Sequence, residues 1–167
     1  MTISRRALIA SAISFPFLAR KALADPKHGP WHGDDEPGTI VIVTGDHTLH
    51  LIGEGTRTSY AIAVGREGAQ WYGETHITHK RKNPEWRPTP NMRKRDPSLP
   101  AVVKPGPRNP LGTRAIYLAE GYLRIHGTND PASIGRNASS GCFRLGRDDI
   151  EELYDLCTVG SKVYVYR

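Results

Sequence analysis

The sequence is poor in cysteine, in aromatic residues and in long apolar runs, and these shortages exclude several classes of protein. Two cysteines in 167 residues cannot build a disulfide-rich scaffold or a four-cysteine zinc site. The one sustained apolar run lies near the N-terminus and is too short to span a bilayer. With 38% hydrophobic and 24% charged residues, the chain is neither disordered nor an integral membrane protein. What remains is a small domain with its own core behind a leader.

The first 24 residues have the pattern of an export signal. A basic pair, Arg5-Arg6, precedes an apolar stretch, and Ala22-Leu23-Ala24 has the small-x-small pattern that signal peptidases cut. The run Ser4-Arg5-Arg6-Ala7-Leu8-Ile9 is similar to the twin-arginine export motif, and an ordinary secretory signal is the alternative. We therefore expect residues 1–24 to be removed during export to the periplasm or cell envelope, which leaves no membrane span.

The positive charge of the chain belongs largely to this leader. The full sequence has a net charge of +6. Removal of residues 1–24 takes away four of the 23 basic residues and none of the 17 acidic ones, so the mature chain carries a net charge of +2. A nucleic-acid partner is therefore disfavoured, because it needs a basic footprint on the folded domain.

After the leader, the sequence predicts a flexible lead-in over residues 25–37 and one domain over residues 38–167. The lead-in is polar and rich in Pro, Gly and acidic residues. The domain contains short β-type runs separated by turn residues, and a Gly45-Asp46 turn joins the first two runs into a hairpin. The strand candidates are residues 39–44, 47–52, 59–64, 74–79, 115–118, 123–126 and 162–166. These runs predict a mainly β domain.

One segment near the C-terminus has the pattern of a helix. Asp148 precedes Glu151 by three residues, which is the spacing of a capping box. Four residues at helical spacing then share one face: Ile150, Leu153, Tyr154 and Cys157. We expect a short helix whose buried face includes Cys157 as a small hydrophobic residue.

Residues 80–114 combine proline with positive charge. They hold eight of the 13 prolines, which exclude most regular structure, and ten Lys or Arg against two acidic residues. Long segments of this kind inside a compact domain are usually functional or disordered. We interpret the segment as a basic, semi-rigid loop that borders a site for an acidic substrate, and a merely solvated loop is the alternative.

The chemistry is expected around Cys142. Gly141 allows a tight turn whose N–H groups can converge on an oxyanion, and Arg144 offers a positive charge near the sulfur. A thiol is a weak nucleophile until it is deprotonated, and a nearby His or Arg lowers its pKa. His126 follows a strand candidate and can complete a Cys–His pair. From the residues alone, a disulfide between Cys142 and Cys157 stays open as the alternative for an exported protein.

The remaining histidines do not form a metal motif. His76 and His79 are three residues apart in a strand candidate and therefore point to opposite faces. No His-Glu-x-x-His spacing is present. We expect neither a metal ion nor another cofactor.

Two blocks of sequence resemble a known active-site signature. His126-Gly127-Thr128 and Ser139-Ser140-Gly141-Cys142-Phe143-Arg144-Leu145 are similar to the signature of the L,D-transpeptidase catalytic domain (YkuD type). Asn109-Pro110-Leu111-Gly112 and the proline-flanked Trp86 resemble the same family, so the similarity covers about residues 38–166. The sequence departs from a common form of the pattern at Ser140, where many members have His, and at Phe143, where Ile or Val is more usual.

The resemblance implies a β-sandwich or barrel with one short helix after the catalytic turn, and an enzyme that acts on bacterial peptidoglycan. Cys142 would attack the carbonyl that joins the L-centre of diaminopimelate to D-Ala in a stem peptide, and a thioester would remain. The amine of a neighbouring diaminopimelate would then form a 3→3 cross-link. A free D-amino acid, a lipoprotein lysine or water would instead give exchange, anchoring or hydrolysis. Carbapenems are expected to inhibit such an enzyme covalently.

The resemblance also assigns roles to individual residues. His126 would be the base, oriented by the Gly127 carbonyl, and the amides of Ser140, Gly141 and Cys142 would form the oxyanion hole. The residues expected to contact substrate are Arg144, Trp86, Arg87, Thr128 and Ser139. Two rival functions use the same fold: a thiol L,D-carboxypeptidase or amidase with water as acceptor, and a non-catalytic wall-binding protein.

Overall fold

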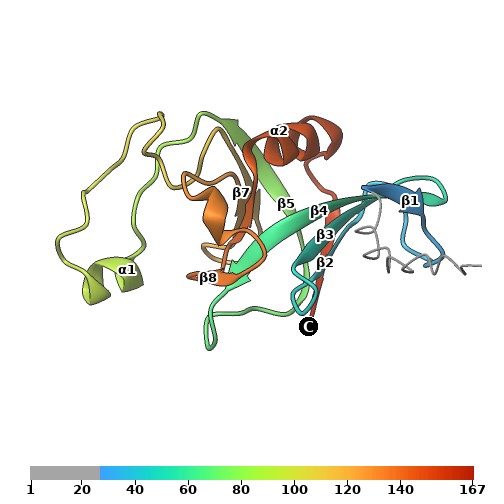
Figure 1. Ribbon diagram of the computed structural model, residues 1–167, viewed down its shortest axis with the longest axis horizontal. Coiled ribbons are helices and arrows are strands. Elements are labelled where there is room, and N and C mark those ends of the chain that lie inside the picture. The colour runs from blue at the N-terminus through green and yellow to red at the C-terminus, as the bar shows by residue number, and fades with distance from the viewer. Residues whose placement is uncertain (1–26) are drawn as a thin grey trace, which may run out of the picture.

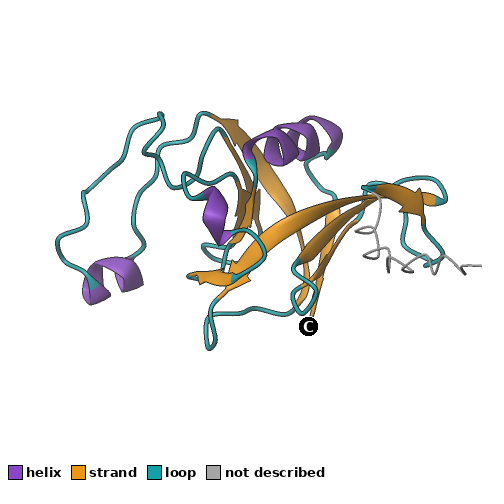
Figure 2. Cartoon of the chain, viewed as in Figure 1, coloured by secondary structure: helices purple, strands orange, loops and turns teal. Residues whose placement is uncertain are grey.

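The computed structural model describes residues 27–167. The export signal expected over residues 1–24 and the first residues of the lead-in lie outside the described part of the chain. Strands make up most of the regular structure, and short helices lie around them (Figure 2). Among residues 27–167, no helix is long and apolar enough to cross a membrane.

Eight strands close into a barrel. Their order around the barrel is β4-β3-β2-β10-β5-β6-β7-β9, and the pairing of β9 with β4 closes the circle. Most neighbours are antiparallel, while β2 and β10 are parallel, as are β7 and β9. The bounds are β2 Ile40–Val43, β3 Thr48–Ile52, β4 Thr56–Gly65, β5 Gly73–Lys82, β6 Arg114–Leu118, β7 Arg124–His126, β9 Phe143–Leu145 and β10 Lys162–Tyr166. The mainly β fold that the sequence predicts is thus confirmed.

The two long strands, β4 and β5, hold the two halves of the barrel together (Figure 1). The first part of β4 pairs with β3, and from Ile62 onward it pairs with β9. Likewise, β5 pairs with β10 over its first residues and with β6 from Ile77 onward. Because each long strand changes its neighbour midway, the sheet curls and its edges meet.

Alternating side chains of these strands fill the barrel. Residues of β2, β3 and β10 that share one face are fully or almost fully buried, as the strand period of two requires. Phe143 and Leu145 of β9 enter the same core, so the strand directly after Cys142 is anchored by two buried side chains. The core therefore fixes the position of the turn that carries the thiol.

The helix α2 (Arg147–Leu156) covers one end of the barrel with the face that the sequence predicts. Ile150 and Leu153 are fully buried, and Tyr154 and Cys157 join the same core. Lys80 donates from Nζ to the carbonyl oxygens of Tyr154 and Cys157 at 2.5 and 2.6 Å, which neutralises the end of the helix.

The predicted start of α2 is wrong. Gly146 is the N-cap residue, no side chain caps the helix, and Asp148 lies inside the first turn. The negative charges of Asp148 and Asp149 still favour the helix there, because they face the positive end of its dipole.

Several short elements were not predicted from the sequence. Within the supposedly flexible lead-in, β1 (His28–Pro30) pairs with β4. Lys27 forms salt bridges with Asp149 and Glu152 of α2, so this part of the lead-in is fastened to the domain. A 3-10 helix, η1 (Pro131–Ser133), and the strand β8 (Asn137–Ser139) precede the catalytic turn.

Residues 83–113, which we call the arm, leave the barrel between β5 and β6 and extend to the left in Figure 1. The expectation of little regular structure over residues 80–114 is wrong at its ends, because residues 80–82 belong to β5 and Arg114 begins β6. Within the arm it holds except for α1 (Pro90–Arg95), whose N-cap Thr89 accepts from the Met92 amide. A bridge between Trp86 and Val103 closes the base of the arm. Asn109 is fully buried there, and its amide donates to the carbonyl oxygens of Pro84, Val103 and Lys104.

Candidate active site

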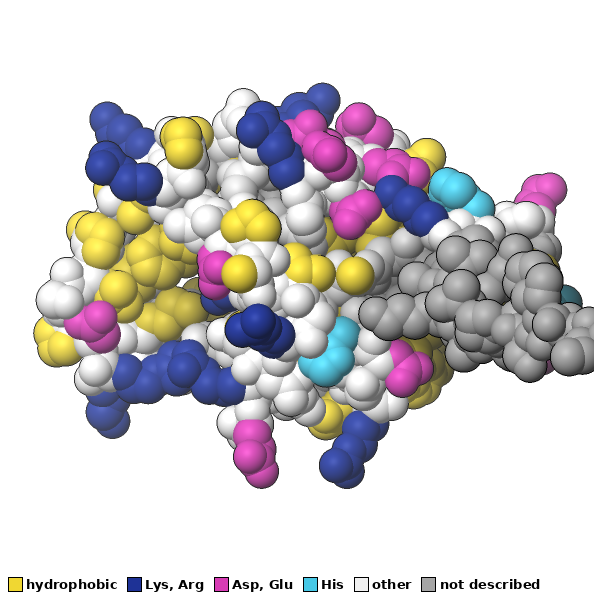
Figure 3. Space-filling model, in the orientation of Figure 1, with side chains coloured by type: hydrophobic (Ala, Val, Ile, Leu, Met, Phe, Trp, Pro, Cys, Tyr) yellow, Lys and Arg dark blue, Asp and Glu magenta, His cyan; other side chains and the backbone are white. Residues whose placement is uncertain are grey.

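A cleft of about 740 Å³ lies between the arm and the barrel, and both Cys142 and His126 line it. The surface is hollowed on this side of the molecule, with hydrophobic side chains in the hollow and Lys and Arg along one edge (Figure 3). The arm contributes Trp86 and α1, the β4–β5 loop contributes Ala69, and the ends of β7 and β9 form the floor. The structure therefore brings together residues that are far apart in the chain.

The turn that carries Cys142 is held by Ser139. The buried Ser139 hydroxyl accepts from the Gly141 amide at 3.0 Å and donates to the Cys142 carbonyl oxygen at 2.5 Å. Gly141 has a φ of 127°, and a Cβ at this position would lie 3.0 Å from the Ala69 carbonyl oxygen. Glycine is therefore required both by the backbone conformation and by the close approach of the β4–β5 loop.

His126 ends β7 and is 5% exposed. Its Nδ1 lies 2.5 Å from the carbonyl oxygen of Gly127. A carbonyl can only accept, so Nδ1 carries the proton and Nε2 keeps a lone pair. The pKa of His126 is lowered to about 3, mainly because the imidazole is buried; the Gly127 hydrogen bond opposes this change, and the positive charges of Arg144 and Arg124 add to it. The imidazole is therefore neutral near pH 7 and has the form that a general base needs.

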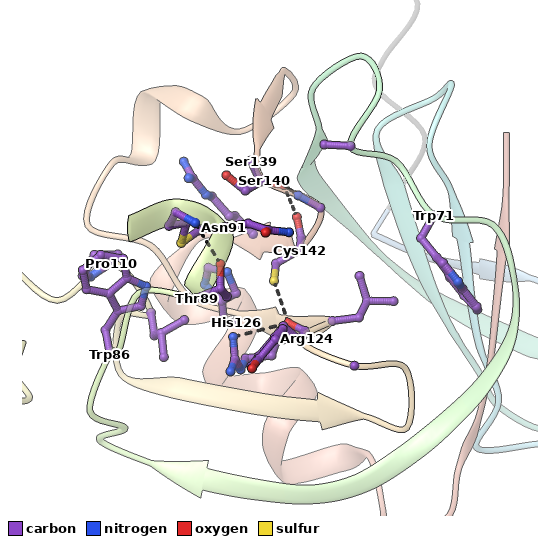
Figure 4. Close-up of a pocket in the computed structure, with 18 of the residues that line it drawn as sticks. Trp71, Trp86, Thr89, Asn91, Pro110, Arg124, His126, Ser139, Ser140 and Cys142 are labelled. Atoms are coloured by element: carbon purple, nitrogen blue, oxygen red, sulfur yellow. Dashed lines mark hydrogen bonds between the residues drawn. The ribbon is translucent and has the colours of Figure 1, made fainter. Parts of the chain in front are cut away.

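The Cys142 thiol is half-buried and lies in the same cleft as the imidazole (Figure 4). Its Sγ donates to the carbonyl oxygen of Tyr122 at 3.4 Å. Burial raises the pKa of Cys142, while Arg124 and Arg144 oppose that rise. The expected net lowering of the thiol pKa is thus not found, because desolvation outweighs the nearby positive charges. The raised pKa favours the protonated thiol near pH 7.

The residues expected to contact substrate divide into two groups. Trp86, Arg87 and Arg144 line the cleft, and Trp86 stands on the side opposite Trp71 (Figure 4). Thr128 is not among the residues that line the cleft, and its hydroxyl accepts from the Asp130 amide at 3.0 Å. Ser139 borders the cleft, but its hydroxyl is engaged inside the catalytic turn.

The proposed oxyanion donors are not equivalent. The Gly141 amide already donates to Ser139, whereas the amides of Ser140 and Cys142 flank it in the same turn. Arg124 and Arg144 also lie near the sulfur, and their positive charges favour the ionised form of the Cys142 thiol. A negative charge that develops beside Cys142 would therefore lie in a positive environment.

The second cysteine has no place in the cleft. Cys142 and Cys157 are both free thiols, and Cys157 is 2% exposed in the core behind α2. Burial raises the pKa of Cys157 to about 11. In the described part of the chain, no three His, Cys, Asp or Glu side chains are grouped so that they could hold a metal ion.

Comparison with known proteins agrees with this geometry. The model of the L,D-transpeptidase catalytic domain, YkuD, matches residues 37–165. The chain belongs to this family. A Bacillus subtilis protein named as the L,D-transpeptidase YkuD is 30% identical over 147 residues, which cover 87% of this chain and 71% of that protein.

Other relatives are more identical over shorter stretches. A Fuscovulum blasticum protein named as an L,D-transpeptidase is 46% identical over 93 residues, or 56% of this chain. The alignment spans only 49% of that relative, and 36% of an Escherichia coli L,D-transpeptidase that is 43% identical. The chain thus spans half or less of the length of these relatives.

Solved structures share the fold. L,D-transpeptidase 3 from Mycobacterium tuberculosis superposes with a TM-score of 0.63 at 16% identity, covering 77% of this chain and 60% of that one. A Brucella melitensis protein that carries the name carnitine operon oxidoreductase is 42% identical, with a TM-score of 0.55, over 83% of this chain and 93% of its own. That name differs from the family shown by the domain model and the curated relatives.

In this L,D-transpeptidase domain, the sequence did not point to Arg124, Arg66 or Arg95. Arg124 could have been found, because it stands two residues before His126 in a strand and so shares its face. Arg66 and Arg95 lie in the β4–β5 loop and at the end of α1, and both reach Ser140. No local pattern brings those two segments together.

Proposed function

We propose that the chain is a cysteine-dependent L,D-transpeptidase that acts on peptidoglycan stem peptides. The observation that carries the proposal is the neutral His126 imidazole with a free Nε2, in one cleft with the Cys142 thiol. The family membership supports the same chemistry. The basic lining of the cleft suits a stem peptide, because its carboxylates carry negative charge.

Acylation begins when the Cys142 sulfur attacks the carbonyl carbon between the L-centre of diaminopimelate and D-Ala. Because the resting thiol is protonated and the imidazole is neutral, the thiol proton moves to His126 Nε2 as the C–S bond forms. For this transfer the thiol hydrogen must leave the Tyr122 carbonyl oxygen, to which it is donated in the resting protein. The C–N bond then breaks, the imidazolium returns the proton to the leaving amine, and D-Ala departs from a Cys142 thioester.

The second half of the reaction reverses these roles. An acceptor amine attacks the thioester, His126 takes its proton, and the thiol is regenerated as the new amide forms. The amine of a neighbouring diaminopimelate would give a 3→3 cross-link, and a free D-amino acid or a lipoprotein lysine would give exchange or anchoring. Water would give hydrolysis, which is the rival L,D-carboxypeptidase reaction.

The oxyanion of both tetrahedral intermediates would be stabilised by the catalytic turn. The amides of Ser140 and Cys142 are the donors of choice, because the Gly141 amide is bound to Ser139. Arg124 and Arg144 add positive charge beside the sulfur.

Related structures support covalent inhibition. L,D-transpeptidase 3 from M. tuberculosis has been solved with a faropenem-derived adduct, and another L,D-transpeptidase has been solved in complex with imipenem. We infer that the strained carbonyl of a carbapenem takes the place of the donor amide and acylates Cys142.

We also propose that residues 1–24 are an export signal and that the mature enzyme is located in the periplasm or cell envelope.

The test is product analysis by mass spectrometry after incubation of the purified protein with a defined tetrapeptide muropeptide. The proposal predicts release of D-Ala and a product that joins two stems, with neither formed by Cys142→Ala. Release of D-Ala with only a tripeptide product would favour the hydrolase. Binding without any product would favour the non-catalytic wall-binding protein.

A further inference from the structure

Two guanidinium groups converge on Ser140, two residues before the proposed nucleophile. Nη2 of Arg66 and Nη2 of Arg95 lie 2.9 and 3.2 Å from the Ser140 hydroxyl oxygen. Arg95 ends α1 on the arm and lines the cleft, whereas Arg66 lies in the β4–β5 loop just before the residues of that loop that line it, so the two approach Ser140 from separate segments. The backbone amide of Arg66 also donates to the Ser139 carbonyl oxygen at 3.0 Å, which ties its loop to the catalytic turn.

The charges of this pair are not compensated. Within residues 27–167, neither Arg66 nor Arg95 forms a salt bridge. Among the described residues that line the cleft, Glu120 is the one acidic side chain against several Lys and Arg. A serine hydroxyl offers lone pairs but no charge, so it leaves the repulsion between two guanidinium groups in place. A bound anion would offset that repulsion.

The geometry points to a carboxylate as that anion. A guanidinium presents a planar fork of donors that matches the two oxygens of a carboxylate, and the bonds are charge-assisted. Both guanidinium groups already reach the Ser140 hydroxyl oxygen, so a carboxylate bound beside this hydroxyl can accept hydrogen bonds from both arginines. A carboxylate held there would also link the arm to the β4–β5 loop across the cleft.

We propose that Arg66, Arg95 and Ser140 form a subsite that binds a carboxylate of the donor stem peptide and makes the enzyme selective for it; this inference rests on the proposed function. The donor has two candidate groups: the carboxylate on the D-centre of diaminopimelate and the terminal carboxylate of the D-Ala that leaves. Both carboxylates lie a few bonds from the carbonyl carbon that Cys142 attacks. Ser140 is two residues from Cys142, so a carboxylate beside Ser140 would be near the reacting carbonyl. Arg144, on β9, is a separate contact.

The test compares three tetrapeptide donors: one with both carboxylates free, one amidated on the diaminopimelate D-centre, and one amidated at the D-Ala terminus. The rate of release of D-Ala, or of its amide, gives kcat/KM for wild type, Arg66→Gln, Arg95→Gln and the double variant. Lys104→Gln is the matched control, because this exposed residue lies on the arm but does not line the cleft and loses the same charge.

We expect wild type to prefer the free donor over one of the amides by about tenfold or more. That preference should fall toward one in the double variant and persist in Lys104→Gln. The amide whose discrimination is lost identifies which carboxylate the subsite holds. A double variant that keeps the wild-type preference against both amides would overturn the subsite.

A separate readout covers failure of the proposed function. If wild type releases nothing from any donor, the activity itself is absent, and the same three peptides are bound to Cys142→Ala in a calorimeter. The subsite still predicts that binding weakens about tenfold when the recognised carboxylate of the peptide is amidated, and about tenfold when both arginines are replaced. Because the two changes remove the same interaction, making both should weaken binding no more than making one. Equal affinity for all three peptides, with or without the arginines, would rule the subsite out.

Discussion

The hydroxyl of Ser139 lies 2.5 Å from the carbonyl oxygen of Cys142, so a buried side chain holds the turn that presents the thiol. The next residue, Ser140, has the same side chain but faces the cleft, where Arg66 and Arg95 reach it. The two adjacent serines therefore have different roles: the Ser139 hydroxyl holds the shape of the turn, and the Ser140 hydroxyl makes contacts in the cleft.

Replacement of these serines should have unequal effects. Ser139→Ala removes both hydrogen bonds of the turn and should lower the free energy of unfolding by about 1–3 kcal/mol. It should also slow acylation by a carbapenem, followed as the gain of covalent mass. Ser140→Ala should keep carbapenem acylation within about tenfold, because the backbone amide of residue 140 remains. Folded Ser140→Pro should be strongly impaired, since proline lacks that amide. A loss of several orders of magnitude in Ser140→Ala would assign the hydroxyl a chemical role.

The buried imidazole predicts a specific pH dependence of stability. The pKa of His126 is lowered from about 6.5 in an unfolded chain to about 3 in the native protein. Between these values the unfolded state binds more protons, so the free energy of unfolding falls as the pH falls, by up to about 1.4 kcal/mol per pH unit from this group. Denaturant unfolding at several pH values between 7 and 4, compared with His126→Gln, isolates this contribution. Parallel curves for the two proteins would show that His126 is not buried as a neutral base.

Most strands and α2 could be predicted because their signals are local, whereas the sandwich or barrel was implied only by the family resemblance. Val163 and Val165 alternate in β10, and Ile150 and Leu153 repeat with the helical period, and all four are buried. The shorter elements gave no such signal. Three residues, as in β8, cannot show a period, and the Asp148 capping pattern was misleading because the helix begins one residue after Gly146.

The active site was predictable only in part for a similar reason. The motif blocks fix Cys142 and His126 within a short stretch of chain, and the structure places both in one cleft. The Ser140 contacts come from segments that meet only after the arm folds back toward the β4–β5 loop. The raised pKa of Cys142 also depends on burial in the assembled fold, which outweighs the charges visible in the sequence.

The base of the arm offers a further prediction. Asn109 is fully buried and bonds to three arm carbonyls and to the Leu111 amide, so Asn109→Ala should loosen the base of the arm. We expect faster trypsin cleavage within residues 83–113 and a higher KM for the donor peptide. Asn137→Ala is the control, because this exposed side chain contacts His47 and both residues lie outside the arm. Equal cleavage rates in the two variants would show that Asn109 does not hold the arm.

Export can be tested independently of catalysis. If residues 1–24 are a twin-arginine signal, Arg5-Arg6→Lys-Lys should leave the precursor inside the cell, and the wild-type mature protein should begin at Asp25. Cell fractionation and N-terminal sequencing give both results. Normal export of the variant would favour the general secretory route.

The most direct test of the account is intact-protein mass spectrometry of the enzyme mixed with a tetrapeptide donor and no acceptor amine. We predict one added mass equal to the donor acyl group without D-Ala, present in wild type and in Cys157→Ala and absent in Cys142→Ala. His126→Ala should form this thioester about 10²–10⁴-fold more slowly. An adduct that persists in Cys142→Ala, or a Cys142–Cys157 disulfide in the active enzyme, would contradict the assignment of Cys142 as the nucleophile.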